Sequence, residues 1–298
     1  MAQLLSLSSY MPGKEKPVRF TYVDEAGISR RDQEPFLVVA GVIVHVDNDL
    51  NGIENQLQRL FDRHIPKRLR NDFVFSAKEV FNGGKYLKRE KDNFIGPREW
   101  PIERRHEIAR DILRVLIKFK LPVAIGFMDR ATFLDDFDLP RDFPEHERTI
   151  AEHVSTYLTC AMMVEHWMRQ NASNENCFMV VENTDNARKM ITDVQHHHQS
   201  KEMQLRWDSI GSVSFPLRKI KHNPHFEPKG VNSPLILADF CAYIFKKILM
   251  DNKNYDQFFE PFRPLLIWFE DSYFQQQTKR LSRIAGRSHQ TQASERSP

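Results

Sequence analysis

The chain has 298 residues, of which 41% are hydrophobic and 28% charged, and its formal net charge is +3. This length is sufficient to bury an apolar core in one large domain or two small ones, so no zinc or disulfide scaffold is required. Cys160, Cys177 and Cys241 lie far apart in apolar runs, and we interpret them as reduced core residues of a cytoplasmic protein.

Neither a membrane span nor an export signal is expected. Residues 1–16 lack the continuous apolar core of a signal peptide, and no stretch reaches the roughly 18 apolar residues that a span needs. The small positive charge permits binding to a phosphate backbone but does not by itself imply it.

Polar composition at both ends predicts disordered tails over residues 1–16 and 279–298. Between them no repeat or long low-complexity linker occurs. We therefore expect a single domain over residues 17–275.

The first two expected elements form a hairpin. Residues 18–23 alternate in polarity and end at the turn Asp24-Glu25-Ala26-Gly27. Residues 36–44 are apolar throughout and β-branched, which is typical of a central strand.

Further along the chain, helical spacing alternates with short apolar runs. This alternation indicates an α/β sheet covered on both faces. We expect helices near 49–63, over 102–119 and over 147–169; strands over 123–128 and 177–181; and a strand pair within 210–221.

The last strong element is a helix that continues to about residue 247. Ser233 is the expected N-cap, and Pro234 suits the first helical position.

Acidic side chains follow three of the expected strands. Asp24, Asp129 and Glu182 occupy strand ends, and the carboxyl ends of strands open onto one ligand crevice in such sheets. Polar residues also end strands without any function, so each acid alone carries little weight.

Asp239 is different, because it lies among apolar residues of the last helix, where a bare carboxylate is costly. It therefore needs a partner. One candidate is Lys246, two turns further on, in a structural ion pair; the other is a divalent cation shared with acids of the sheet. Sites of several carboxylates suit Mg²⁺ or Mn²⁺, which can support phosphodiester cleavage.

The Asp24-Glu25-Ala26-Gly27 turn after a first strand, the Ala77-Lys78-Glu79 segment and the Leu237-Ala238-Asp239 helix resemble the DUF3800 family over about residues 18–250. That resemblance implies a ribonuclease-H-like mixed sheet flanked by helices on both faces. It also implies a nuclease, hence a hydrolase, in a mobile-element or phage-defence setting.

By the same resemblance, Asp24, Glu182 and Asp239 are the catalytic, metal-binding acids. Asp129 could replace Glu182 as the middle ligand, depending on which strand neighbours the first, and we favour Glu182. Glu25 and Glu79 are additional candidate ligands, although a solvated or salt-bridged acid is the simpler interpretation of Glu79.

Two basic clusters could contact nucleic acid, represented by Arg68 and Arg70 in the first and by Lys219 and Lys221 in the second. Solvated surface charge is the alternative for both. The leading hypothesis is a Mg²⁺- or Mn²⁺-dependent nuclease acting on DNA or RNA. The alternative is a non-catalytic module that binds nucleic acid, a protein partner or a second copy of itself.

Overall fold

The computed structural model describes residues 17–28, 31, 33–71, 73–83, 100–136, 140–183, 188–209 and 216–267. The segments expected as tails, 1–16 and 279–298, lie outside these ranges.

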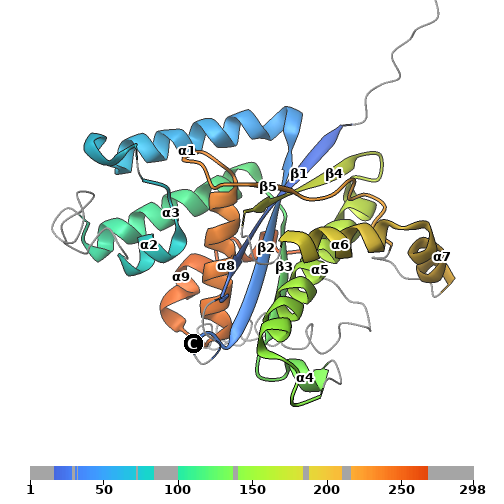
Figure 1. Cartoon of the computed structure of the whole chain (residues 1–298). Helices are drawn as coiled ribbons and strands as arrows, with labels where there is room; N and C mark the ends of the chain where they lie inside the picture. Colours follow the sequence, from blue (N-terminus) through green and yellow to red (C-terminus); the bar gives the residue numbers. More distant parts are fainter. Residues whose placement is uncertain are drawn as a thin grey trace, which may run out of the picture.

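A mixed five-stranded sheet lies at the centre of the molecule (Figure 1). Its strands are β1 (Val18–Ala26), β2 (Phe36–His45), β3 (Val123–Asp129), β4 (Asn176–Glu182) and β5 (His225–Glu227), in the order β3-β2-β1-β4-β5. β2 runs antiparallel to β1 and β3, whereas β4 is parallel to β1 and β5 is parallel to β4. The predicted α/β class and the hairpin of the first two strands are confirmed.

Helices cover both faces of the sheet. On one face α8 (Leu235–Leu249) contacts β1 and β2, and α1 (Asn51–His64) and α3 (Ile102–Phe119) share its hydrophobic cluster. On the other face α5 (Glu145–Asn171) contacts β2 and β3. The continuous apolar run of β2 follows from this double cover, because its residues are buried on both sides.

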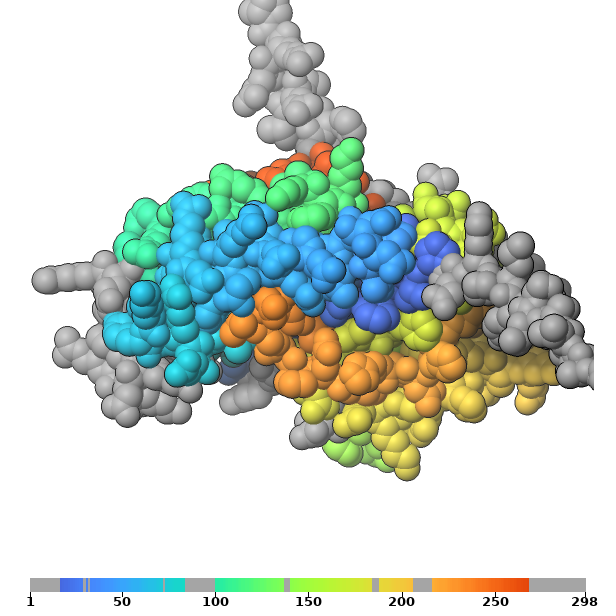
Figure 2. Space-filling view, turned by 90° about the horizontal axis from the view of Figure 1, so that it is seen from above, coloured from blue at the N-terminus to red at the C-terminus, as the bar shows by residue number. Residues whose placement is uncertain are grey.

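Shorter helical segments complete the described part of the chain: η1 (Val46–Leu50), η2 (Lys67–Leu69), α2 (Ala77–Asn82), α4 (Phe133–Asp136), α6 (Arg188–Gln199), α7 (Lys201–Ser209), η4 (Lys253–Tyr255), α9 (Asp256–Phe259) and η5 (Arg263–Leu265). Seen from above, α1 in blue lies between α3 in green and the orange segment that leads into α8 (Figure 2). No helix within the described ranges has both the length and the apolarity needed to cross a bilayer.

The expected strand pair within 210–221 is wrong for the described residues of that range. There, Ile220 makes only an isolated bridge to Cys177, and the strand that extends the sheet beyond β4 is β5, five residues later. The N-cap of α8 is Pro234 and the first helical residue is Leu235, one position later than predicted for each; Ser233 Oγ still accepts a hydrogen bond from the Leu235 amide at 3.3 Å. All three cysteines are buried and unpaired, as predicted.

The close approach of α5 to the sheet depends on a glycine in β3. A Cβ atom on Gly126 would lie 2.1 Å from the backbone carbonyl oxygen of Thr156 in α5. We expect Gly126→Ala to lower the free energy of unfolding by about 1–3 kcal/mol or more, because backbone must move. Urea denaturation measures this change.

Gly52→Ala is the matched control. Its Cβ would meet only the ring of Phe119, a side chain that can shift, and alanine favours the helix. Equal stability of the two variants would contradict the tight contact between β3 and α5.

Candidate active site

The carboxyl ends of β1, β4 and β5 meet at one edge of the sheet. Val23 pairs with Val181, so Asp24 and Glu182, the next residues of β1 and β4, lie beside each other. Strand alternation turns Asp24 toward the face covered by α8, where Asp239 lies in the second turn of the helix. The sheet and one helix therefore bring together three acids that are far apart in the sequence.

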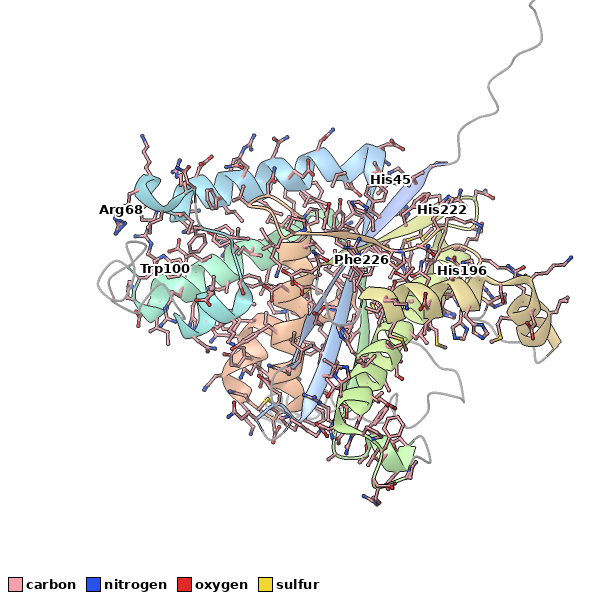
Figure 3. The ribbon with its side chains drawn as sticks, in the orientation of Figure 1. His45, Arg68, Trp100, His196, His222 and Phe226 are labelled. Carbon is pink, nitrogen blue, oxygen red and sulfur yellow. The ribbon has the colours of Figure 1, made fainter. Side chains whose placement is uncertain are left out.

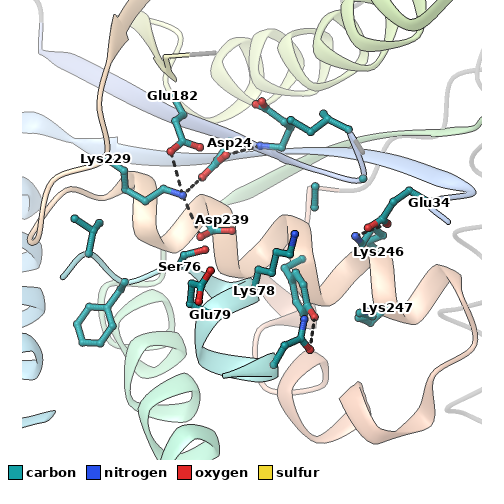
Figure 4. A pocket seen from close by; sticks show the side chains of 18 of the residues that line it. Asp24, Glu34, Ser76, Lys78, Glu79, Glu182, Lys229, Asp239, Lys246 and Lys247 are labelled. Carbon is teal, nitrogen blue, oxygen red and sulfur yellow. Dashed lines mark hydrogen bonds and ion pairs between the residues drawn. The ribbon is translucent and has the colours of Figure 1, made fainter. Parts of the chain in front are cut away.

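The three carboxylates surround the ammonium group of Lys229, which follows β5 by two residues (Figure 4). Its Nζ lies 2.6 Å from Asp24 Oδ2, 3.0 Å from Asp239 Oδ2 and 3.4 Å from Glu182 Oε1. Because β5 is parallel to β4, its carboxyl end delivers the lysine to the edge that holds the acids. One cationic position is thus shared by all three acids.

Backbone amides hold two of these carboxylates in place. Asp24 Oδ1 accepts a hydrogen bond from the Glu25 amide at 2.7 Å, and Asp239 Oδ2 accepts one from the Ala77 amide at 2.9 Å. Ala77 is the first residue of α2, so Asp239 ties α2 to α8. These two amide contacts fix the positions of the Asp24 and Asp239 side chains.

Lys246 is not the partner of Asp239, which corrects the structural alternative considered from the sequence. Lys246 Nζ lies 2.6 Å from Glu34 Oε2, whereas the ion pair of Asp239 is made by Lys229. Helical spacing placed Lys246 and Asp239 two turns apart, but a side chain of that length has other acids within reach.

The electrostatics of this cluster are set by burial and by a shortage of positive charge. Burial is the largest cause that raises the pKa of Asp24 well above its usual value; Lys229 opposes it, while Asp239 and Glu182 add to it. Burial lowers the pKa of Lys229, but Asp24, Asp239 and Glu182 outweigh burial and raise it overall. With every group ionised, three carboxylates and one ammonium sum to a charge of −2.

Asp129, the alternative middle ligand, lies at the end of β3, and β2 separates that strand from β1. Its Oδ1 accepts a hydrogen bond from the Ala131 amide at 3.0 Å. Glu182 is the acid on the strand next to β1, which was the arrangement we favoured.

The two additional candidates take different positions. Glu25 alternates to the opposite face of the sheet, where its Oε2 lies 3.9 Å from His153 Nε2 of α5. Burial lowers the pKa of His153 to about 4, so this contact involves a neutral imidazole at neutral pH. Glu79 lines the cavity that also contains Asp24, Glu182 and Asp239.

The four basic residues proposed to contact nucleic acid lie away from this cavity. Arg68 is exposed on η2, beyond the end of α1 (Figure 3), and Arg70 forms an ion pair with Asp62 at 2.9 Å. Lys219 and Lys221 flank Ile220, which bridges to Cys177 at the amino end of β4. Glu182 is at the other end of that strand, so the second cluster does not flank the acids.

The acids open onto a cavity of about 630 Å³. Beyond the acids, its lining includes polar and charged residues of α2, α8 and the segment before β2, among them Glu34, Lys78, Asn82, Tyr243, Lys246 and Lys247. The cavity is therefore acidic at one end and rich in lysine at the other (Figure 4).

Lys229 is the functional candidate that sequence reasoning missed. It lies in the irregular segment Pro228-Lys229-Gly230 between a three-residue strand and the start of α8, a region without periodic pattern. The sequence offered one indication of this role: Lys229 precedes, by only a few residues, a helix that contains a buried acid.

Comparisons with protein families, curated proteins and solved structures find no match to this chain. Among the described residues, no three Asp, Glu, His or Cys side chains already form a metal-ligand group. Asp24, Glu182 and Asp239 instead each contact the lysine ammonium. Three carboxylates that converge on one cation are nevertheless the donor type that Mg²⁺ and Mn²⁺ take in proteins.

The ionic role of Lys229 can be measured by its removal. Lys229→Met leaves three acids without their shared ammonium, and breaking a buried pair in this way costs about 3–5 kcal/mol. We expect a loss of that order in the free energy of unfolding, measured by urea denaturation. Lys201→Met, on the exposed start of α7, should change stability by less than about 0.5 kcal/mol.

A double-mutant cycle separates lost charge from lost packing. Adding Asp239→Asn to Lys229→Met removes one of the uncompensated charges, so the double variant should recover part of the stability lost in the single one. Strictly additive losses would show that Lys229 does not act as the counter-ion of Asp239.

Proposed function

We propose that this chain is a metal-dependent phosphodiesterase that cleaves DNA or RNA, with Asp24, Glu182 and Asp239 as ligands of Mg²⁺ or Mn²⁺. The observation that carries the proposal is the convergence of these three carboxylates, from β1, β4 and α8, on one cationic position in the wall of a cavity. With every group ionised, the three acids and Lys229 sum to a charge of −2, which favours the uptake of further positive charge.

The topology supports assignment of the sheet to the ribonuclease-H-like class. The sheet is mixed, with the strand order β3-β2-β1-β4-β5; β2 is antiparallel to both of its neighbours, and β4 and β5 run parallel to β1. Asp24 lies on the central strand of this order. Membership of the DUF3800 family, with its mobile-element or phage-defence setting, remains a proposal that rests on the sequence resemblance.

The chemistry in question is hydrolysis, in which a water oxygen forms a bond to phosphorus and the P–O bond to the leaving oxygen breaks. Bound divalent ions can lower the pKa of the attacking water and stabilise the leaving oxygen. The residues of the chain hold the acids in place through the Glu25 and Ala77 amides. The Lys229 ammonium supplies positive charge beside the site of a phosphate.

A second reading of the same cluster is a non-catalytic module that binds nucleic acid or protein. Lys229 already compensates part of the acidic charge, and such a cluster can also serve as a structural ion-pair network. The two readings differ in their response to metal and in activity.

Cleavage should depend on each of the three acids. In Mg²⁺ or Mn²⁺, we expect Asp24→Asn, Glu182→Gln and Asp239→Asn each to reduce cleavage of labelled DNA or RNA oligonucleotides by roughly 100-fold or more. Mutation of a residue that only hydrogen-bonds to a metal ligand typically reduces activity about 10–100-fold, and removal of a ligand itself should reduce it at least as much. Asp135→Asn, an exposed acid paired with Arg141, is the control and should keep full activity. If the folded Asp239→Asn variant cleaves as well as the wild type, Asp239 is not a catalytic residue.

Binding of a divalent ion should also be visible without substrate. Millimolar Mg²⁺ or Mn²⁺ should raise the melting temperature of the wild type, because a ligand of the native state stabilises it. Asp24→Asn should lose this increase, and Asp135→Asn should keep it. Absence of any metal response, including a test with Ca²⁺ and an oligonucleotide together, would favour the non-catalytic module.

A further inference from the structure

The lysine-rich end of the cavity is separate from the acids but lies in line with them along α8. Lys246 and Lys247 follow Asp239 by seven and eight residues, which corresponds to about 10–12 Å along the helix axis. Lys78, in the first turn of α2, lines the same cavity between these regions (Figure 4). The cavity thus has two charged parts on one continuous wall.

The positive charges at this end are not all compensated. Lys246 is buried and paired with Glu34 at 2.6 Å. Lys78 is exposed and Lys247 half-buried, and no carboxylate in the described part of the chain lies within ion-pair distance of either. Lys247 instead lies over the ring of Tyr243, with its Nζ 5.3 Å from the ring centroid. The charges of Lys78 and Lys247 are therefore not neutralised by an ion pair, and both can attract an anion.

We propose that Lys78 and Lys247 form a second subsite that binds a backbone phosphate of a nucleic acid strand. This inference rests on the proposed function, because it takes the acids as the place of the reacting phosphate and Lys78 and Lys247 as the place of a phosphate further along the strand. It names the substrate class as a polynucleotide rather than a mononucleotide or a free phosphate.

The distance between the acids and the second subsite fits a short nucleic acid strand. Asp239 and Lys247 are about 12 Å apart along the helix axis, which corresponds to roughly three to four nucleotides at 3.4 Å per stacked step and to fewer in an extended strand, and Lys78 lies between them. A nucleoside monophosphate carries one phosphate group, so it cannot place a phosphate at both the acids and the lysines. Short strands of a few nucleotides can.

The chemistry of the subsite favours contact with phosphate over contact with bases. Lysine is a compact charge that suits phosphate oxygens. Tyr243 is not an open stacking platform, since its ring stacks on Phe81 with a centroid distance of 5.4 Å and an interplanar angle of 5°. Its hydroxyl donates a hydrogen bond to Asn82 Oδ1 at 3.2 Å. Backbone contacts of this kind position a strand without reading its sequence.

The test is fluorescence anisotropy with labelled 12-nucleotide single strands of DNA and RNA that share one sequence, in Ca²⁺, over a series of salt concentrations. The variant is Lys78→Gln/Lys247→Gln, and the matched control is Lys201→Gln/Lys253→Gln, which changes two exposed lysines outside the cavity. Melting temperatures of both variants show that they are folded.

We expect the Lys78/Lys247 variant to bind at least roughly 10-fold more weakly and to lose about one unit of salt slope, because the subsite contacts one phosphate. The control should match the wild type. Unlabelled 4- and 8-nucleotide strands should compete, whereas a nucleoside monophosphate should not.

Equal affinity and equal salt slope in the Lys78/Lys247 variant and the control would overturn the subsite, as would a wild type that binds no strand at low salt. The outcome is distinguishable from failure of the proposed function. Lysine-dependent binding without cleavage in Mg²⁺ or Mn²⁺ would support the subsite and exclude the nuclease. Cleavage that is unaffected by the lysine variant would support the nuclease and exclude the subsite.

Discussion

Three carboxylates cannot be held around one point in a largely buried site unless positive charge lies among them. Removal from water disfavours each ionised acid, and their mutual repulsion adds to that cost. Lys229 supplies part of the required charge through its contacts with Asp24, Glu182 and Asp239. One ammonium group from the segment after β5 thus links side chains of β1, β4 and α8.

The same requirement extends to the surrounding elements. Asp239 binds the first amide of α2 as well as Lys229, so the helix that carries Lys78 and Glu79 is held against α8 by a residue of the charged cluster. α8 in turn carries Lys246 and Lys247 along the cavity. The acidic and basic parts of the cavity are therefore connected through two helices and the Asp239 carboxylate. Substitution of Asp239 should alter the positions of charged residues in both parts.

Most strands of the sheet could be predicted because a strand that is buried on both faces is a continuous run of apolar residues. β2 is apolar from Phe36 to Val44, and the helical spacing of residues 102–119 matches α3. The order of the strands in the sheet was harder to predict, since an apolar run identifies a strand but does not show which strands pair with it. Choosing Glu182 over Asp129 required the knowledge that β4, and not β3, lies next to β1.

The part of the site that sequence could not supply is Lys229. Its position depends on β5, a three-residue strand too short to show alternation, and on the irregular segment after it, whose residues follow no period. The partner wrongly considered for Asp239, Lys246, illustrates the converse problem. Periodicity shows which residues share a helix face, but it does not show that Glu34, 212 positions away, lies closer.

The presence of a lysine at the centre of the acids is compatible with a metal site when the charges are counted. A divalent ion added to three carboxylates and one ammonium brings the sum from −2 to zero, whereas the same ion in exchange for the lysine leaves −1. Neutrality would thus favour a proposed ion that binds beside Lys229 over one that replaces it, and repulsion between the two cations would move the ammonium away from the ion. The cavity is the open side of the cluster, and a phosphate bound there would offer the displaced ammonium a new partner. A lysine that compensates the acids in the free protein would then contact the phosphate in the complex.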